Sequence, residues 1–316
     1  MLRDRSTRKA KASRRALVTT AATLIVPLAA LILAAPASAE PKGIFKIFNQ
    51  CTVENKEVTR CLYDKTTSGE FSVGTSKVPI NKSLILQGGL VSTGNHEHPS
   101  EYYLLAAKNN ETLSKTELTV PGGLGGVIGC EEIKGEGLSE KLLREDCRTI
   151  YEQKMTAVTA VLELVASAKH LATFNEAASS EEKGTALTLL VRIHLKNAFL
   201  GSSCYVGSEA NPVKLTLTTG ETHPPAGFKS LKGAFGKQEA LEEKGQKALR
   251  ITGDSLVEND FSEPGAEGCG GTYSFLIDPI IDQKLKLPNK AGENTAIFSG
   301  ELNLASSEAV IASEKF

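Results

Sequence analysis

The 316-residue sequence contains no tryptophan and only six tyrosines, so it offers few of the flat rings on which sugars stack. It has no G-x-S-x-G nucleophile motif, no G-x-x-x-x-G-K phosphate-binding loop and no C-x-x-C pair. The apolar run at residues 21–35 is shorter than the roughly 20 residues of a membrane-spanning helix. These absences argue against a stacking-based sugar site, a P-loop enzyme, a zinc–thiolate centre and a transmembrane anchor.

The N-terminal residues carry the pattern of an export signal. A basic segment precedes the apolar run, and Ala37-Ser38-Ala39 then offers the small residues that a signal peptidase reads. We predict a signal peptide over residues 1–39 and a secreted region over residues 40–316 that keeps no transmembrane anchor. The pair Arg14-Arg15 leaves a twin-arginine signal open as the export route.

Removing the predicted signal changes the charge balance. The whole chain has 36 basic and 37 acidic residues, and the signal contains seven of the basic and one of the acidic ones. The region 40–316 therefore has a net charge of about −7, which repels phosphate backbones. We expect no nucleic-acid partner and predict an extracellular or envelope ligand of unknown identity.

All six cysteines follow the predicted signal, and an even number in an exported chain indicates disulfides. Six cysteines allow 15 connectivities, and the sequence does not choose among them. Pairing of sequence neighbours is the simplest of these arrangements. It would join Cys51 to Cys61, Cys130 to Cys147 and Cys204 to Cys269.

The region 40–316 reads mainly as β-structure. In residues 186–195, apolar side chains alternate with mostly polar ones, as in a strand buried on one face of an antiparallel sheet. Similar segments separated by Gly, Asn, Ser and Pro indicate further strands. We predict a mainly β, antiparallel, β-sandwich-like and disulfide-braced fold. It would form one large domain or two packed β subdomains.

Two short helices are expected within this β-structure. Residues 138–153 place Leu138, Leu142, Leu143 and Cys147 on one helical face, which predicts a helical insertion there. A second helix is predicted to begin at Asp278 as N-cap with Pro279 at the first helical position.

Gly253-Asp254-Ser255-Leu256 resembles the nucleophile block of GDSL lipases and esterases. In that family the catalytic histidine follows the serine, whereas all five histidines of this chain precede Ser255. A serine without a positioned base is a weak nucleophile, so we interpret Gly253-Asp254 as a hairpin turn. No catalytic residue is predicted.

Three further segments have a functional and a structural interpretation. The glycine-rich loop 120–130 lacks phosphate-loop spacing and is interpreted as a packed or flexible loop, with insertion of Leu124, Val127 and Ile128 into a membrane as the alternative. His96 and His98 are the best candidate metal ligands, but a pair in a loop is more often solvated, so no metal or cofactor is predicted. His194 is expected to be solvated on the polar face of its strand.

The segments NAFLGSSCYVGSEANPV, LVENDFSEPGAEGCGG and SFLIDPIIDQKLKLP resemble segments of a family of uncharacterised secreted actinobacterial proteins. The resemblance runs over most of the region 40–316 and implies export and a cysteine-braced β fold, but no activity. We therefore expect a secreted, non-catalytic binding or cell-envelope protein. A secreted hydrolase with an unrecognised site and a membrane-active protein using loop 120–130 remain as alternatives.

Overall fold

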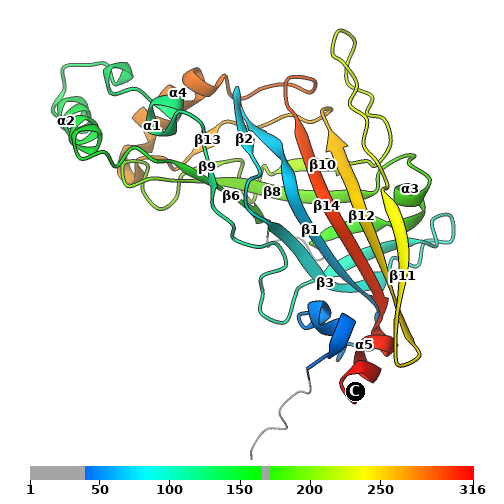
Figure 1. Cartoon of the computed structure of the whole chain (residues 1–316). Helices are drawn as coiled ribbons and strands as arrows, with labels where there is room; N and C mark the ends of the chain where they lie inside the picture. Colours follow the sequence, from blue (N-terminus) through cyan, green and yellow to red (C-terminus); the bar gives the residue numbers. More distant parts are fainter. Residues whose placement is uncertain (1–39, 166–170) are drawn as a thin grey trace, which may run out of the picture. The chain divides into compact units, whose positions relative to one another are not determined.

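The computed structural model describes residues 40–165 and 171–316, so the predicted signal peptide lies outside the described residues (Figure 1). All strand pairs in the 14-stranded sheet are antiparallel, which confirms the predicted mainly β class. The strands are β1 (Val58–Val73), β2 (Ser76–Pro79), β3 (Leu84–Ser92), β4 (Glu101–Leu105), β5 (Leu118–Thr119), β6 (Thr159–Leu164), β7 (Ala172–Asn175), β8 (Leu187–Lys196), β9 (Tyr205–Val206), β10 (Val213–Leu217), β11 (Lys237–Glu243), β12 (Gln246–Glu258), β13 (Ala266–Glu267) and β14 (Ala296–Ser306).

The sheet curls round until two of its strands meet again. Following the pairing, the order runs β12, β14, β1, β3, β4, β7, β8 and β10, and a bridge between Thr218 and Val257 then joins the end of β10 to β12. In Figure 1, β1, β14 and β12 lie side by side in front, and β8 and β10 cross behind them. The sandwich-like packing therefore comes from one sheet whose two halves enclose the main core.

Strand β8 follows the predicted alternation along its whole length. Its residues are in turn buried and partly exposed from Leu187 to Lys196, so the buried leucine, valine and isoleucine side chains face the core. One edge of β8 pairs with β7 and β6, and the other with β10 and β9. This central position links the strands on both sides of the curled sheet.

The helical elements cover the ends of the sheet. They are η1 (Gly43–Phe48), α1 (Gly123–Val127), η2 (Cys130–Glu132), α2 (Leu138–Glu152), α3 (Glu176–Ser180), η3 (Gly271–Tyr273), α4 (Ser274–Leu285) and α5 (Ser307–Ser313). Helix α2 occupies the predicted insertion. Within the described residues, no helix is long and apolar enough to cross a bilayer.

The predicted start of the second helix is wrong. Helix α4 begins at Ser274, and Pro279 lies inside it. Asp278 does not cap this helix, because its carboxylate accepts hydrogen bonds from the backbone N–H groups of Gly268 (3.0 Å) and Cys269 (2.8 Å). The aspartate therefore fixes the neighbouring cysteine loop, a tertiary role that local sequence does not reveal.

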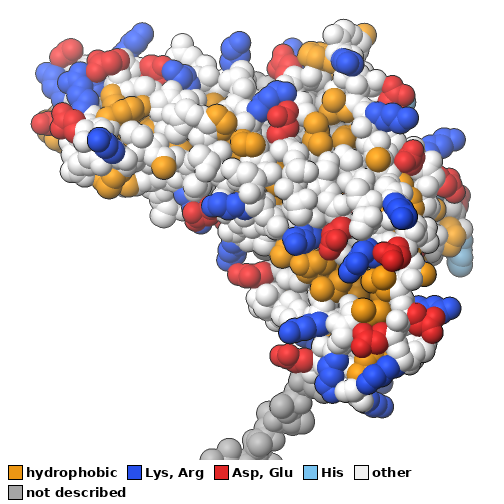
Figure 2. All heavy atoms as spheres, viewed as in Figure 1, with side chains coloured by type: hydrophobic (Ala, Val, Ile, Leu, Met, Phe, Trp, Pro, Cys, Tyr) orange, Lys and Arg blue, Asp and Glu red, His pale blue; other side chains and the backbone are white. Residues whose placement is uncertain are grey.

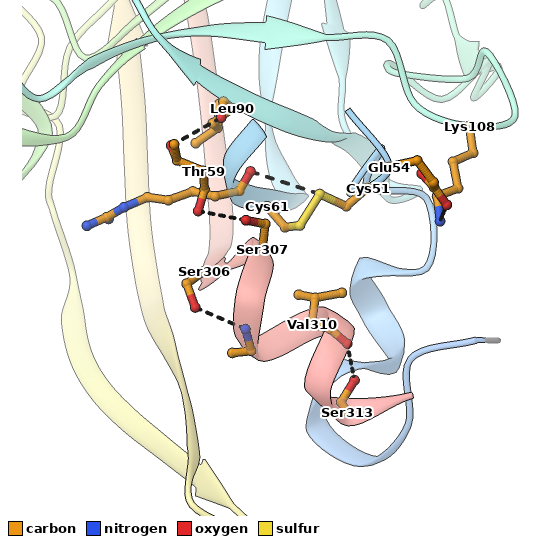
Figure 3. The surroundings of a disulfide bond; sticks show 12 residues. Cys51, Glu54, Thr59, Cys61, Leu90, Lys108, Ser306, Ser307, Val310 and Ser313 are labelled. Carbon is orange, nitrogen blue, oxygen red and sulfur yellow. Dashed lines mark hydrogen bonds and ion pairs between the residues drawn. A yellow bond between two sulfur atoms is a disulfide. The ribbon is translucent and has the colours of Figure 1, made fainter. Parts of the chain in front are cut away.

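The three disulfides join the predicted sequence neighbours, Cys51–Cys61, Cys130–Cys147 and Cys204–Cys269, with Cα–Cα distances of 5.6, 5.6 and 4.0 Å. The first lies in a small second core beneath η1 and α5, together with Phe45, Phe48 and Val310. Figure 3 shows α5 beside this bridge, where the Ser307 hydroxyl donates to the Thr59 carbonyl (3.3 Å). The disulfide ties the segment before β1 to β1 itself.

Candidate functional site

The regular strand pairing is interrupted between β10 and β12. Thr218 and Val257 exchange two backbone hydrogen bonds, with N–O distances of 3.0 and 2.8 Å. One residue further along β12, the side-chain carboxylate of Glu258 acts as the hydrogen-bond acceptor in place of a backbone carbonyl. It accepts hydrogen bonds from both the backbone N–H and the hydroxyl of Thr216. We call this junction of β10 and β12 the seam.

Two open cavities flank the seam. The larger has a volume of about 500 Å³ and the smaller about 210 Å³, and both are lined by Thr216, Glu258 and Asp260. Because they share these residues, we treat them as one feature, the seam cleft. Its combined size falls within the range of roughly 300–1,000 Å³ that is typical of small-molecule sites. Its ionisable lining residues are Lys214, Glu221, His223, Glu258, Asp260 and Glu263.

Acidic groups dominate the lining of the seam cleft. Glu258 and Asp260 lie at the junction of the cavities, Glu263 lines the larger one and Glu221 the smaller one. Glu258 and Glu263 are only 2% and 1% exposed. The acids come from β12 and the residues directly after it, and from the segment that follows β10.

Burial raises the pKa of Glu258 to about 7, and the nearby charge of Asp260 acts in the same direction against the hydrogen bonds from Thr216. Burial also raises the pKa of Glu263 to about 7, opposed by hydrogen bonds from Asn289 and Gly74. Both carboxyl groups therefore exchange protons near neutral pH.

Glu263 anchors the wall of the larger cavity. One carboxylate oxygen, Oε2, accepts from the Gly74 N–H (2.7 Å) and from the Asn289 side chain (2.9 Å). Asn289 in turn accepts from the Glu263 N–H (2.9 Å) and from the Asn294 side chain (2.7 Å). The other carboxylate oxygen, Oε1, is buried without a hydrogen-bond partner among the described residues. Such an oxygen favours either protonation or a bound donor.

A second group of buried carboxyls lies inside the curled sheet. Asp64 of β1 lines two small interior cavities of about 10 and 30 Å³, and Asp254 of β12 lines the smaller one. Burial raises the pKa of Asp64 well above its usual range, with further contributions from the charges of Asp254 and Glu301. Burial likewise raises the pKa of Asp254 to about 7. These volumes hold a few water molecules at most, so this pair belongs to the core.

The predicted hairpin turn at Gly253-Asp254 is wrong. Both residues lie within β12, where the register against β14 shifts between Thr252 and Asp254. Gly253 has a φ of +72°, which is the conformation of a bulge residue. Ser255 shares a hydrogen bond with Ser299 across the β12–β14 ladder, at an Oγ–Oγ distance of 2.8 Å. This contact gives the hydroxyl a structural role.

Loop 120–130 packs into the core. It contains α1, and Leu124, Val127 and Ile128 are all 0% exposed. The membrane-insertion hypothesis required these side chains at the surface, and their burial removes its basis. The interpretation as a packed loop is therefore the one that the structure shows.

The histidines named from the sequence occupy two different environments. His96 and His98 are exposed in the loop before β4, and the described residues contain no group of three or more His, Cys, Asp or Glu side chains arranged to hold a metal. His194, expected in solvent, has a side chain only 12% exposed. Its Nδ1 lies 3.0 Å from Glu163, and its ring packs on Tyr205. Glu163 and Tyr205 on the neighbouring strands therefore cover His194, although the alternation of apolar and polar residues in β8 predicts that it is exposed.

No family model, curated protein or solved structure matches this chain. The cleft residues were not singled out by the sequence, although Glu258, Asp260 and Glu263 are closely spaced in it. From the sequence alone, Glu258 would be placed at the exposed end of a strand. In the structure it is buried, because Thr216 of β10 contacts its carboxylate. The spacing of acids alone could have drawn attention to this segment.

Proposed function

We propose that this chain is an exported, non-catalytic binding protein whose ligand occupies the seam cleft. The observation that carries the proposal is a cavity pair lined by convergent polar groups and placed where the sheet departs from regular pairing. Three disulfides are typical of the oxidising compartments outside the cytoplasm, which supports export.

The supports of the cleft favour binding by a preorganised site. Glu258 is held by two hydrogen bonds from Thr216, and Glu263 is held by the Gly74 N–H and Asn289. The Cys204–Cys269 bridge braces the chain shortly after the cleft residues of β12. Fixing the lining before a ligand arrives lowers the entropy that binding must overcome.

The hydrogen bonding of Glu258 also bears on the hydrolase alternative. A general acid must reach the substrate with a carboxyl oxygen, but each oxygen of Glu258 faces Thr216. We therefore assign Glu258 to holding the seam, and the exposed Asp260 beside it to contacting the ligand.

Filling the cleft tests this function. Ala291 and Ser262 both line the larger cavity, so Ala291→Trp and Ser262→Trp each place a bulky side chain there. Ala240→Trp is the control, because Ala240 is exposed on β11, outside both cavities. A library of small polar fragments is screened against each protein by ligand-observed NMR.

We expect fragments that bind the wild type and the Ala240→Trp control to lose binding to both cleft variants. Circular dichroism spectra that match the wild type show that each variant is folded. Fragment binding that persists in the folded cleft variants, or a wild type that binds no fragment at millimolar concentration, would overturn the proposed site.

A further inference from the structure

We infer that the ligand of the seam cleft is an extended segment of a partner polypeptide, which adds to the open edge of β10 as a further strand. This inference rests on the proposed function and specifies its ligand class. It follows from the direction of the backbone groups of β10, from the path of the chain after β12, and from the cavity of about 500 Å³ beside that edge.

Alternate residues of β10 and its extension present their backbone groups to the seam. Thr218 exchanges two backbone hydrogen bonds with Val257, and the Thr216 N–H donates to the Glu258 carboxylate. In an antiparallel strand, the backbone groups of successive residues point to opposite edges, so residues two apart share an edge. Lys214 lies two residues before Thr216 in β10 and therefore turns its N–H and C=O towards the same side.

The chain that would pair with these groups turns away from them. In a continued antiparallel ladder, the pair after the bridge would be Thr216–Asn259. The Asn259 C=O instead accepts from the Gly292 N–H (2.9 Å), so the ladder ends there. Within the described residues, no hydrogen-bond partner meets the C=O of Thr216 or the N–H and C=O of Lys214. Three backbone groups of β10 are therefore open along the seam.

The larger cavity lies beside these open groups. Lys214 and Thr216 line it, together with apolar residues that include Phe261, Pro264 and Pro288. Its volume of about 500 Å³ lies by itself within the roughly 300–1,000 Å³ of ligand sites. An added strand would lie about 4.7–4.9 Å from β10. A peptide main chain carries both the donors and the acceptors that the open groups lack, at the spacing of a strand, which favours it over other polar ligands.

The sheet also ends at β11, and this edge is less suited to strand addition. Its sequence KQEALEE has three glutamates and one lysine among seven residues, and none of these residues lines either cavity of the seam cleft. Charged side chains on an edge strand are a common protection against pairing with another chain. The open edge of β10 is instead bordered by a cavity, which gives an incoming strand a place to lie.

The test selects ligands from a phage-displayed library of random heptapeptides, by binding to the wild type and loss of binding to Ala291→Trp. Enriched peptides are synthesised with capped ends, and isothermal titration calorimetry measures their affinity. Each is then remade with one N-methylated peptide bond at each position in turn. We expect two positions, two residues apart, at which N-methylation weakens binding about threefold to tenfold, because the carbonyls of Lys214 and Thr216 each accept one peptide N–H.

Two variants test the edge of β10 itself. Lys214→Ala removes the side-chain charge and keeps the backbone N–H, whereas Lys214→Pro removes both. Proline is tolerated where the N–H of a strand residue faces away from the ladder, as it does here. We expect Lys214→Pro to bind the peptides about threefold to tenfold more weakly than Lys214→Ala. Circular dichroism checks that both variants fold, and the N-methylation series on the wild type does not depend on them.

Each remaining outcome overturns the inference. If N-methylation weakens binding at no position, or if folded Lys214→Ala and Lys214→Pro bind equally, the peptide is not held by its main chain. If every enriched peptide binds Ala291→Trp as tightly as the wild type, its site lies outside the cleft. If no peptide is enriched while small polar fragments still occupy the cleft, the inference fails although the proposed function survives. If neither peptides nor fragments bind, the proposed function fails with it.

Discussion

The strand β12 is held in different ways along its two edges. Towards β14 it forms a continuous ladder from Ala248–Ala305 to Glu258–Ala296, interrupted by a single register shift. The other edge pairs with β11 from Gln246–Glu243 to Thr252–Lys237. Beyond that ladder it shows single bridges at Ser255–Ala234 and Val257–Thr218, and a side-chain contact from Glu258 to Thr216. Along the β14 edge, the backbone groups of the two strands form hydrogen bonds with each other. At the seam, cavities lie beside the strand, and the backbone N–H of Thr216 donates to the titratable carboxyl group of Glu258.

This difference accounts for the position of the cleft. In a complete ladder each backbone donor has a backbone acceptor, and neighbouring strands lie about 4.7–4.9 Å apart, which leaves no room for a ligand. Where β10 and β12 diverge, side chains must satisfy the backbone and cavities open beside them. Figure 2 shows charges of both signs scattered over the face that carries the ladder.

The largest expected effect is a loss of stability as pH rises. Asp254, Glu258 and Glu263 have pKa values of about 7 in the folded protein, against 3.8, 4.5 and 4.5 ordinarily. Between about pH 4 and pH 7 the unfolded chain releases protons that the folded protein keeps, so folding becomes less favourable. The loss is roughly 3 kcal/mol for each glutamate and roughly 4 kcal/mol for Asp254, and it persists above pH 7. Urea unfolding at pH 5 and pH 8 measures it.

The variant Glu263→Gln measures how much one carboxyl group contributes to this pH-dependent loss of stability. At pH 8 the variant should be more stable than the wild type by up to about 3 kcal/mol, and at pH 5 the two should be similar. Glu239→Gln, at an exposed position on the edge strand, is the control. A wild type that is equally stable at pH 5 and pH 8 would contradict the raised pKa values.

The next largest effect is the loss of stability when the Cys204–Cys269 disulfide is removed. Cys204–Cys269 closes a loop of 65 residues, and Cys130–Cys147 closes one of 17. Replacing both cysteines of the long loop by serine should destabilise the protein by about 4 kcal/mol, against about 3 kcal/mol for the short loop. Thermal unfolding of the two double variants compares them, and non-reducing peptide mapping checks the pairing. An equal or smaller loss for the long loop would contradict this order.

The smallest effect compares one hydroxyl on each edge of β12. Thr216→Val removes a donor to the buried Glu258, and Ser255→Ala removes the contact with Ser299 in the ladder. We expect Thr216→Val to cost about 1–3 kcal/mol because a buried carboxyl loses a partner, and Ser255→Ala about 0.5–1.5 kcal/mol. Chemical denaturation at pH 8 measures both. If Ser255→Ala lost more unfolding free energy than Thr216→Val, side-chain hydrogen bonds would contribute more to stability in the β12–β14 ladder than at the seam.

Much of the local structure could be predicted from the sequence. The alternation in β8 and the position of α2 follow from the periodicity of apolar residues, because a strand or helix with one buried face repeats at a fixed interval. The disulfide partners are sequence neighbours, so the simplest pairing was also the observed one. The predicted turn at Gly253 failed because a glycine with positive φ serves a bulge as well as a turn.

The sequence by itself determined the β class, the cysteine framework and the export-type N-terminal pattern, since each depends on composition or on short-range spacing. Only the tertiary structure decided where the sheet meets itself and which acids that meeting buries. Thr216 and Glu258 are 42 residues apart, and neither position looks unusual in its own strand. Their contact exists because the intervening chain brings β10 beside β12, and this long-range approach gives Glu258 its burial, its raised pKa and its place in the seam cleft.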